Sequence, residues 1–177
     1  GMAEFKTVSA GMTAADTMVK TADVDIIEAE TVCPGKYIVI ITGELSAVNA
    51  SVEAAKTVHS MHLIDSFVLG NPADEIFPAI YGASKVEIVN SLGIIETYDA
   101  AAIIVAADQA AKTAEVSLIE IRLARGMCGK SYLLITGEVA AVEAAIARAQ
   151  KAVEPRGMYL DSSVIARPDK KLIDQIL

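Results

Sequence analysis

The two halves of this chain repeat one another, and this repeat limits the possible folds more than any other feature of the sequence. The halves align at a shift of 92 residues, which grows to 94 and then to 96 through short insertions in the second copy. The aligned segments include Ala14-Ala15-Asp16 with Ala106-Ala107-Asp108, Lys20-Thr21-Ala22 with Lys112-Thr113-Ala114, Thr42-Gly43-Glu44 with Thr136-Gly137-Glu138, and Asp65-Ser66 with Asp161-Ser162. A register kept over a whole half indicates a tandem duplication of a unit of roughly 90 residues. We therefore expect two domains, residues 1–86 and 87–177.

Each repeat unit predicts the same order of elements. The first opens with a short strand and an Ala-rich helix whose apolar residues recur at helical spacing, with Asp16 and Lys20 placed as an i,i+4 ion pair. Two strands rich in Val and Ile, a second helix, another strand and a short helix follow. The predicted ranges are 2–6, 9–21, 24–32, 37–42, 45–60 and 63–69, with 93–97 and 100–113 opening the second copy. We expect an α/β (α+β) sandwich, each domain having a small, mostly antiparallel sheet with helices on one face.

Composition excludes several classes of partner. The chain has 15 Lys and Arg against 23 Asp and Glu, a net charge of −8, and no basic cluster longer than Lys170-Lys171. A phosphate-binding groove needs a basic face, so nucleic acid is not an expected partner. The longest apolar stretch, residues 100–107, is far shorter than the roughly 20 residues that span a bilayer. Two cysteines in 177 residues fit a reducing cytoplasm rather than a disulfide scaffold.

Two predicted hairpin tips carry the candidate functional residues. Cys33-Pro34-Gly35-Lys36 separates two predicted strands, and Pro followed by Gly predicts a type II turn with these two residues at its centre. The equivalent tip of the second unit is longer, from Arg122 to Lys130. Its central residues are Arg125, Gly126, Met127, Cys128 and Gly129.

Four segments carry a resemblance to a known family. They are Gly-Ile-Ile-Glu-Thr (93–97), the Ala-Ala-Asp…Lys-x-Ala-x-Val run (106–116), Thr-Gly-Glu-Val-Ala-Ala-Val (136–142) and Val-Ile-Ala-Arg-Pro (164–168). Together they resemble the bacterial microcompartment shell domain. Two such domains in one chain, with Cys-Pro-Gly-Lys in the first hairpin, are similar to the tandem-domain, iron–sulfur type of shell protein from propanediol-utilisation microcompartments. The resemblance covers nearly the whole chain.

The resemblance implies a structural shell protein rather than an enzyme. Such a tandem chain forms a homotrimer that mimics a hexamer and tiles, with other shell proteins, into a facet around an enzyme core in the bacterial cytoplasm. The hairpin tips surround a central pore, with Pro34, Gly35 and Lys36 in the first tip. By resemblance, Cys33 from three subunits holds one [4Fe–4S] cluster there, for electron transfer or cluster exchange with encapsulated redox enzymes.

The resemblance also implies which residues form the edge between tiles. The Lys near the end of the first helix of each domain is an edge residue, which gives Lys20 and Lys112. The Arg of the Arg-Pro turn supports the same edge and is Arg167 here. The first domain departs from the pattern, because Asn71 takes the place of this Arg and lacks its two-pronged donor.

The residues alone leave alternatives open. A lone Cys33 can be an ordinary turn residue, and iron–sulfur clusters usually take four thiolates, although a threefold axis would bring three to one point. Cys128 can be a second thiol ring or a small residue in a Gly-rich turn. His59 and His62, at i,i+3, fit a solvated helix end better than a metal site. Two other functions remain: a shell tile with a plain metabolite pore and free Cys33 thiols, and a stand-alone oligomeric redox or regulatory protein.

Overall fold

The contacts divide the protein into two compact units. The computed structural model describes residues 1–86 and 89–176. The first unit comprises Gly1–Asn71 together with Ala124–Gly129, and the second comprises Pro72–Leu123 and the chain from Lys130 onward. The segment Ala124–Gly129, here called the 124–129 loop, therefore belongs by its contacts to the first unit.

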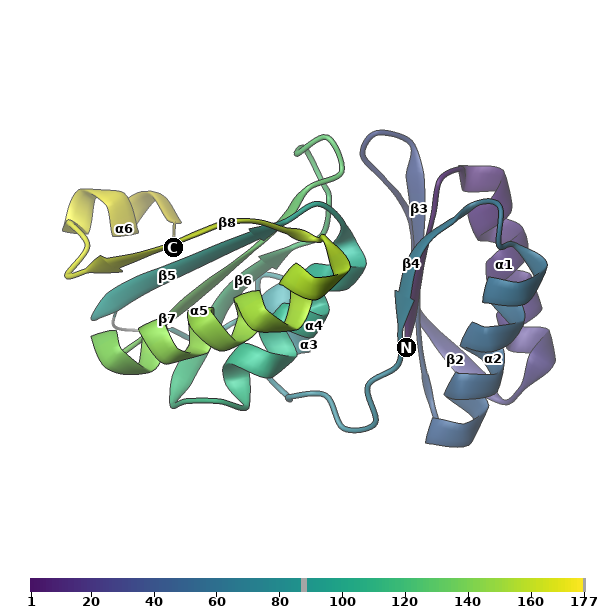
Figure 1. Ribbon diagram of the computed structural model, residues 1–177, viewed down its shortest axis with the longest axis horizontal. Coiled ribbons are helices and arrows are strands. Elements are labelled where there is room, and N and C mark those ends of the chain that lie inside the picture. Colours follow the sequence, from purple (N-terminus) through teal and green to yellow (C-terminus); the bar gives the residue numbers. More distant parts are fainter. Residues whose placement is uncertain (87–88, 177) are drawn as a thin grey trace. The chain divides into compact units, whose positions relative to one another are not determined.

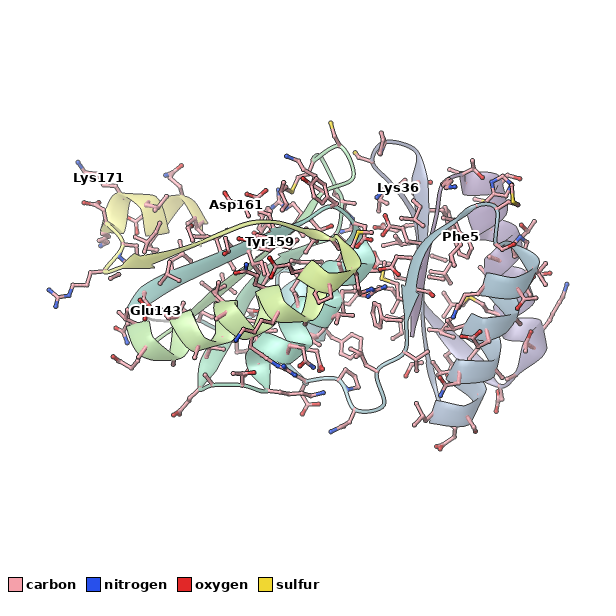
Figure 2. All side chains as sticks on the ribbon, viewed as in Figure 1. Phe5, Lys36, Glu143, Tyr159, Asp161 and Lys171 are labelled. Carbon is pink, nitrogen blue, oxygen red and sulfur yellow. The ribbon has the colours of Figure 1, made fainter. Side chains whose placement is uncertain are left out.

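The first unit is a four-stranded antiparallel sheet with two helices on one face, as Figure 1 shows. The strand order is β2-β3-β1-β4. The elements are β1 (Met2–Phe5), α1 (Val8–Thr21), β2 (Val24–Val32), β3 (Lys36–Gly43), α2 (Leu45–Val58) and β4 (Leu63–Phe67). Side chains alternate between the faces of a strand, so Ala3, Phe5 and Tyr37 face the helices and form part of the main core. In Figure 2 Phe5 lies between the sheet and the helices.

Small residues let α1 lie close to its sheet. Gly11 sits so near Tyr37 that an added Cβ would lie 2.4 Å from the Tyr37 ring. Thr7 caps the start of the helix, its hydroxyl accepting from the Ala10 N–H at 3.3 Å. Ser51 of α2 donates to the Met18 carbonyl at 2.9 Å and joins the two helices inside the core.

The second unit has the same architecture, which confirms the predicted duplication and α+β fold. Its strand order is β6-β7-β5-β8, equivalent position by position to the first sheet. The elements are α3 (Ile76–Ile80), β5 (Ser91–Thr97), α4 (Ala100–Ala111), β6 (Val116–Arg122), β7 (Ser131–Gly137), α5 (Val139–Val153), a 3₁₀ turn (Glu154–Arg156), β8 (Tyr159–Ala166) and α6 (Lys170–Ile176). Asp99 caps α4 as Thr7 caps α1, its carboxylate accepting from the Ala102 N–H at 2.7 Å.

The other face of the second sheet is also apolar. Leu92, Ile119 and Leu134 form a buried cluster there, and Ile176 of α6 packs against it. Figure 1 shows α6 across the sheet from α5. Part of this face therefore packs against other segments of its own unit.

The contact boundary differs from the boundary that the repeat predicts. The predicted division between residues 86 and 87 involves residue 87, which lies outside the described residues. The contacts separate the units after Asn71 instead. The reason is α3, which packs on β6 and α4, and Glu75 before it, whose carboxylate accepts from the Leu118 N–H at 3.1 Å.

Among the described residues, no helix combines the length and the apolar character that crossing a membrane requires.

Candidate functional site at the Cys33 hairpin

The turn that carries Cys33 is not of the predicted type. The Gly35 N–H donates to the Val32 carbonyl at 2.9 Å, so Cys33 and Pro34 are the two central residues. The Cys33–Pro34 peptide bond is cis, and a cis-Pro at the second central position defines a type VI turn. The type II prediction was wrong because it placed the turn one residue too far along the chain. Gly35, with a φ of +99°, is the last residue of the turn instead of one of its two central residues.

Two hydrogen bonds join Cys33 to the 124–129 loop. The Cys33 N–H donates to the Ala124 carbonyl at 3.1 Å. The Gly126 N–H donates to the Cys33 sulfur, with the two heavy atoms 3.4 Å apart. Cys33 is half-buried and free of any disulfide. The sulfur thus accepts a hydrogen bond from a backbone N–H, a kind of contact that sulfurs in metal clusters also make.

Lys36 is directed into the unit. Its ammonium forms an ion pair with the fully buried Glu4 of β1 and donates to the Gly129 carbonyl at 3.1 Å. Figure 2 labels Lys36 at the hairpin. We expected this ammonium to offset the charge of an anionic group at the tip. The Lys36 charge is instead already matched by the Glu4 carboxylate. The donor that contacts the Cys33 sulfur is the Gly126 N–H.

Arg125 anchors the 124–129 loop to β2. Its guanidinium binds the carboxylates of Glu28 and Glu30, with Nε 2.7 Å from the Glu30 oxygen. Glu28 and Glu30 are two residues apart and share one face of β2. Burial raises the pKa of Glu28 above its ordinary value, the Glu30 carboxylate adds to this shift, and Arg125 opposes it.

These acidic residues share the sheet face that lies away from the helices. Pairing across the strands puts Glu4 opposite Asp65 and Ile38, while Ile38 also faces Glu30. Sequence reasoning did not assign a role to Glu4, Glu28 or Glu30. The repeat held one signal, because Glu4 and Glu28 recur as Glu96 and Glu120 at the shift of 92.

The second cysteine lies elsewhere on the same loop. Cys128 is exposed and has a φ of +53°, while Met127 before it is half-buried. Within residues 1–86 and 89–176, no three His, Cys, Asp or Glu side chains of one chain come together as a metal site.

The predicted edge residues are exposed to different degrees. Lys20 is 72% exposed and pairs with Asp16 at 2.6 Å, which confirms the predicted i,i+4 ion pair. Lys112 pairs with Asp108 at 2.7 Å, but Asp108 is buried and also accepts from the Ala73 N–H at 3.0 Å. The remaining two edge residues, Asn71 and Arg167, are both exposed.

The two histidines have different surroundings. The His59 ring lies 3.3 Å from the Thr17 hydroxyl and packs edge-on against Phe5 with ring centres 6.2 Å apart. His62 is exposed. His59 is thus a packing residue at the end of α2.

Comparison with known proteins decides the family. The model of the BMC domain matches residues 1–72 and again residues 91–168, once in each repeat. The chain belongs to the BMC-domain family of microcompartment shell proteins. Both halves of the duplication are therefore BMC domains, in tandem.

Three known microcompartment proteins resemble this chain over most or all of their length. The bacterial microcompartment shell protein PduT of Citrobacter freundii is 34% identical over 177 residues, covering 100% of this chain and 96% of that protein. The crystal structure of a microcompartment protein from Desulfitobacterium hafniense DCB is 44% identical, with a TM-score of 0.86 over 98% of this chain and 96% of its own. A fused permuted hexameric shell protein of the RMM microcompartment shares the fold alone, at 18% identity and a TM-score of 0.65, over 87% of this chain and 80% of its own.

Proposed function

We propose that three copies of this tandem BMC chain form a pseudo-hexameric ring that tiles into a microcompartment facet in the bacterial cytoplasm. One duplicated chain carries two of six equivalent units, so threefold closure completes the ring. The Cys33 hairpins and the 124–129 loops line its central pore. Other shell proteins are the neighbours within the facet, and encapsulated redox enzymes are the partners on the pore's inner side.

We further propose that the three Cys33 sulfurs hold one [4Fe–4S] cluster in this pore. The observation that carries the proposal is the half-buried Cys33 sulfur at a hairpin tip, held by the Gly126 N–H in a tandem shell protein. Three thiolates leave one iron for a non-protein ligand, and such a cluster transfers single electrons or exchanges ligands.

The residues around Cys33 fit this group. The protein carries a net charge of −8, which disfavours an anionic cluster, and the Lys36 charge is already matched by Glu4. The Gly126 N–H supplies local positive character without adding a charge. The described residues of one chain hold no group of three such ligands. In the proposed trimer, three chains would bring three Cys33 sulfurs to one point.

Anaerobic reconstitution with iron and sulfide tests the cluster. The native protein should gain visible absorption and, on reduction, an electron paramagnetic signal. Cys33→Ser should lose both and remain a trimer, while the matched variant Cys128→Ser should lose neither. A native protein that binds no iron, with intact sheets, would support a plain metabolite pore with free thiols. Loss of the signal in Cys128→Ser alone would move the site to the other cysteine.

A further inference from the structure

One side chain of the 124–129 loop, Arg125, reaches back to β2. Arg125 places its guanidinium between Glu28 and Glu30, with Nε 2.7 Å from the Glu30 oxygen and Nη2 bonded to both carboxylates. Two carboxylates that bind one arginine fix both the position and the orientation of its guanidinium, because its N–H donors form a rigid planar fork. The Glu28 side chain is only 10% exposed, so part of this clamp is shielded from solvent.

The same loop presents its backbone to Cys33 on both sides of Arg125. Ala124, the residue before it, accepts from the Cys33 N–H at 3.1 Å, and Gly126, the residue after it, donates to the Cys33 sulfur at 3.4 Å. The anchored residue is therefore flanked by the two residues that contact Cys33. At the far end of the loop the Gly129 carbonyl accepts from Lys36 at 3.1 Å, which ties that end to the Cys33 hairpin.

We infer that Arg125, clamped by Glu28 and Glu30, is the positioning residue that aims the Gly126 N–H at the Cys33 sulfur. The loop needs such an anchor because its backbone is unusual. Ala124 and Cys128 both have a φ of +53°, a region that residues other than glycine seldom adopt. A clamp at Arg125 holds the intervening amide in the one orientation that reaches the sulfur.

This inference concerns the hydrogen bond at the Cys33 sulfur, and its meaning for redox chemistry rests on the proposed cluster. Hydrogen bonds to cluster sulfurs are among the features that set reduction potential. An N–H donor stabilises the more negative, reduced state. Removing the clamp should therefore make the potential more negative.

The first test uses the metal-free trimer and needs no cluster. Amide hydrogen exchange, read residue by residue by NMR, reports the Gly126 N–H directly. We expect its exchange to accelerate about three- to tenfold in Arg125→Ala, which is the loss of one hydrogen bond of ordinary net strength. Cys33→Ala should accelerate it to a similar extent, because it removes the acceptor.

A matched control separates the clamp from a general charge effect. Arg122 pairs with Glu120 on β6, three residues before Arg125, so Arg122→Ala removes the same charge without touching the loop. It should leave Gly126 exchange unchanged. The double variant Glu28→Gln with Glu30→Gln removes the clamp from its other side and should reproduce Arg125→Ala. Exchange at the native rate in Arg125→Ala or in Cys33→Ala would overturn the inference.

The second test uses the reconstituted protein. Arg125→Ala should shift the cluster's midpoint potential in the negative direction, Arg125→Lys should restore only part of it, and Arg122→Ala should not move it. An unchanged potential in Arg125→Ala would contradict the redox role of the clamp. If the native protein holds no cluster, the proposed function fails, while the exchange experiment still decides the role of Arg125.

Discussion

Lys36 and Glu4 form an ion pair that is largely shielded from solvent. Glu4 is fully buried and the Lys36 side chain is 13% exposed. Removing one member of a buried pair leaves an uncompensated charge, which costs far more than the pair contributes. Because Lys36 is the last residue of the Cys33-Pro34-Gly35-Lys36 tip, this ion pair also holds that end of the tip in place.

We predict that Glu4→Ala lowers the free energy of unfolding by about 3–5 kcal/mol, the cost of stranding a buried charge. Denaturant titration measures it. Asp16→Ala, which breaks the exposed pair with Lys20, is the control and should cost no more than about 1 kcal/mol. The double variant Glu4→Leu with Lys36→Met should recover most of the loss. A Glu4→Ala protein as stable as the native one would contradict this account.

Glu28 predicts a pH dependence of stability. Burial raises its folded-state pKa above the ordinary value, so the folded protein holds this proton more tightly than the unfolded chain. Its contribution to stability is present at low pH and is lost as the pH rises through the raised folded-state pKa. The native protein should therefore gain stability relative to Glu28→Gln as the pH is lowered from neutral toward the ordinary range of a glutamate carboxyl.

Denaturant melts of both proteins at several pH values measure this difference. Glu53→Gln removes an equal charge from an exposed helical site beside Lys56 and should show no such trend relative to the native protein. A difference between native and Glu28→Gln that stays constant, or that shrinks toward low pH, would refute the assignment.

Residue-level prediction from the sequence worked where partners are close in the chain. The Asp16–Lys20 pair follows from helical spacing alone. Arg125 lies 97 residues from Glu28 and 95 from Glu30, and no local pattern joins them. Gly126 contacts Cys33 through its backbone, which side-chain identity does not encode.

The two repeats differ in which element supplies the large side chain where the first helix of the domain packs on its sheet. In the first, Gly11 on α1 makes room for Tyr37 on β3. The equivalent positions in the second repeat, at shifts of 92 and 94, are Ile103 and Ser131, both buried. The large residue is on the strand in one copy and on the helix in the other.

We predict that Gly11→Ala lowers stability by about 1–3 kcal/mol, because overpacking forces the helix or the ring to move. The added Cβ would lie 2.4 Å from Tyr37. Gly70→Ala is the matched control, since its Cβ would meet only Leu45, at 3.5 Å. Thermal melts of both variants decide the matter. Gly11→Ala melting at the native temperature would show that this approach is looser than described.

Most elements could be predicted because their patterns are local. The range of β2 was predicted to the residue, and most other boundaries differ by only a residue or two, as at α2, which ends at Val58 rather than at residue 60. The turn at Pro34 was misassigned because the choice of its central residues depends on which N–H reaches Val32. The placement of α3 depends on its packing against β6, which the repeat in sequence does not encode.

At the scale of the whole molecule, the family assignment favours the two shell functions over a stand-alone redox protein. In the proposed facet, assembly would depend on the edges of each trimer. Lys20 is the better residue to change in a test of the edge. Its ion-pair partner Asp16 is 58% exposed, so replacing Lys20 leaves no buried charge unpaired. Lys112 also neutralises the buried Asp108, so changing it would disturb the fold as well.

We predict that Lys20→Glu abolishes two-dimensional sheets and leaves the trimer intact, because each tile repeats the lost contact along its edge. Electron microscopy detects the sheets, and light scattering gives the size of the particle. Lys56→Glu makes the same charge change at another helical lysine paired with a glutamate and should leave sheets unaffected. Sheets that persist in Lys20→Glu would place the edge elsewhere.

Native mass spectrometry can be applied to the anaerobically reconstituted protein. It counts chains and clusters in one particle, and so examines the trimer and the shared Cys33 site together. We predict one dominant species of three chains that carries a single [4Fe–4S] cluster, and three chains without a cluster in Cys33→Ser. Single chains as the dominant species, or trimers that carry either no cluster or one cluster per chain, would contradict it.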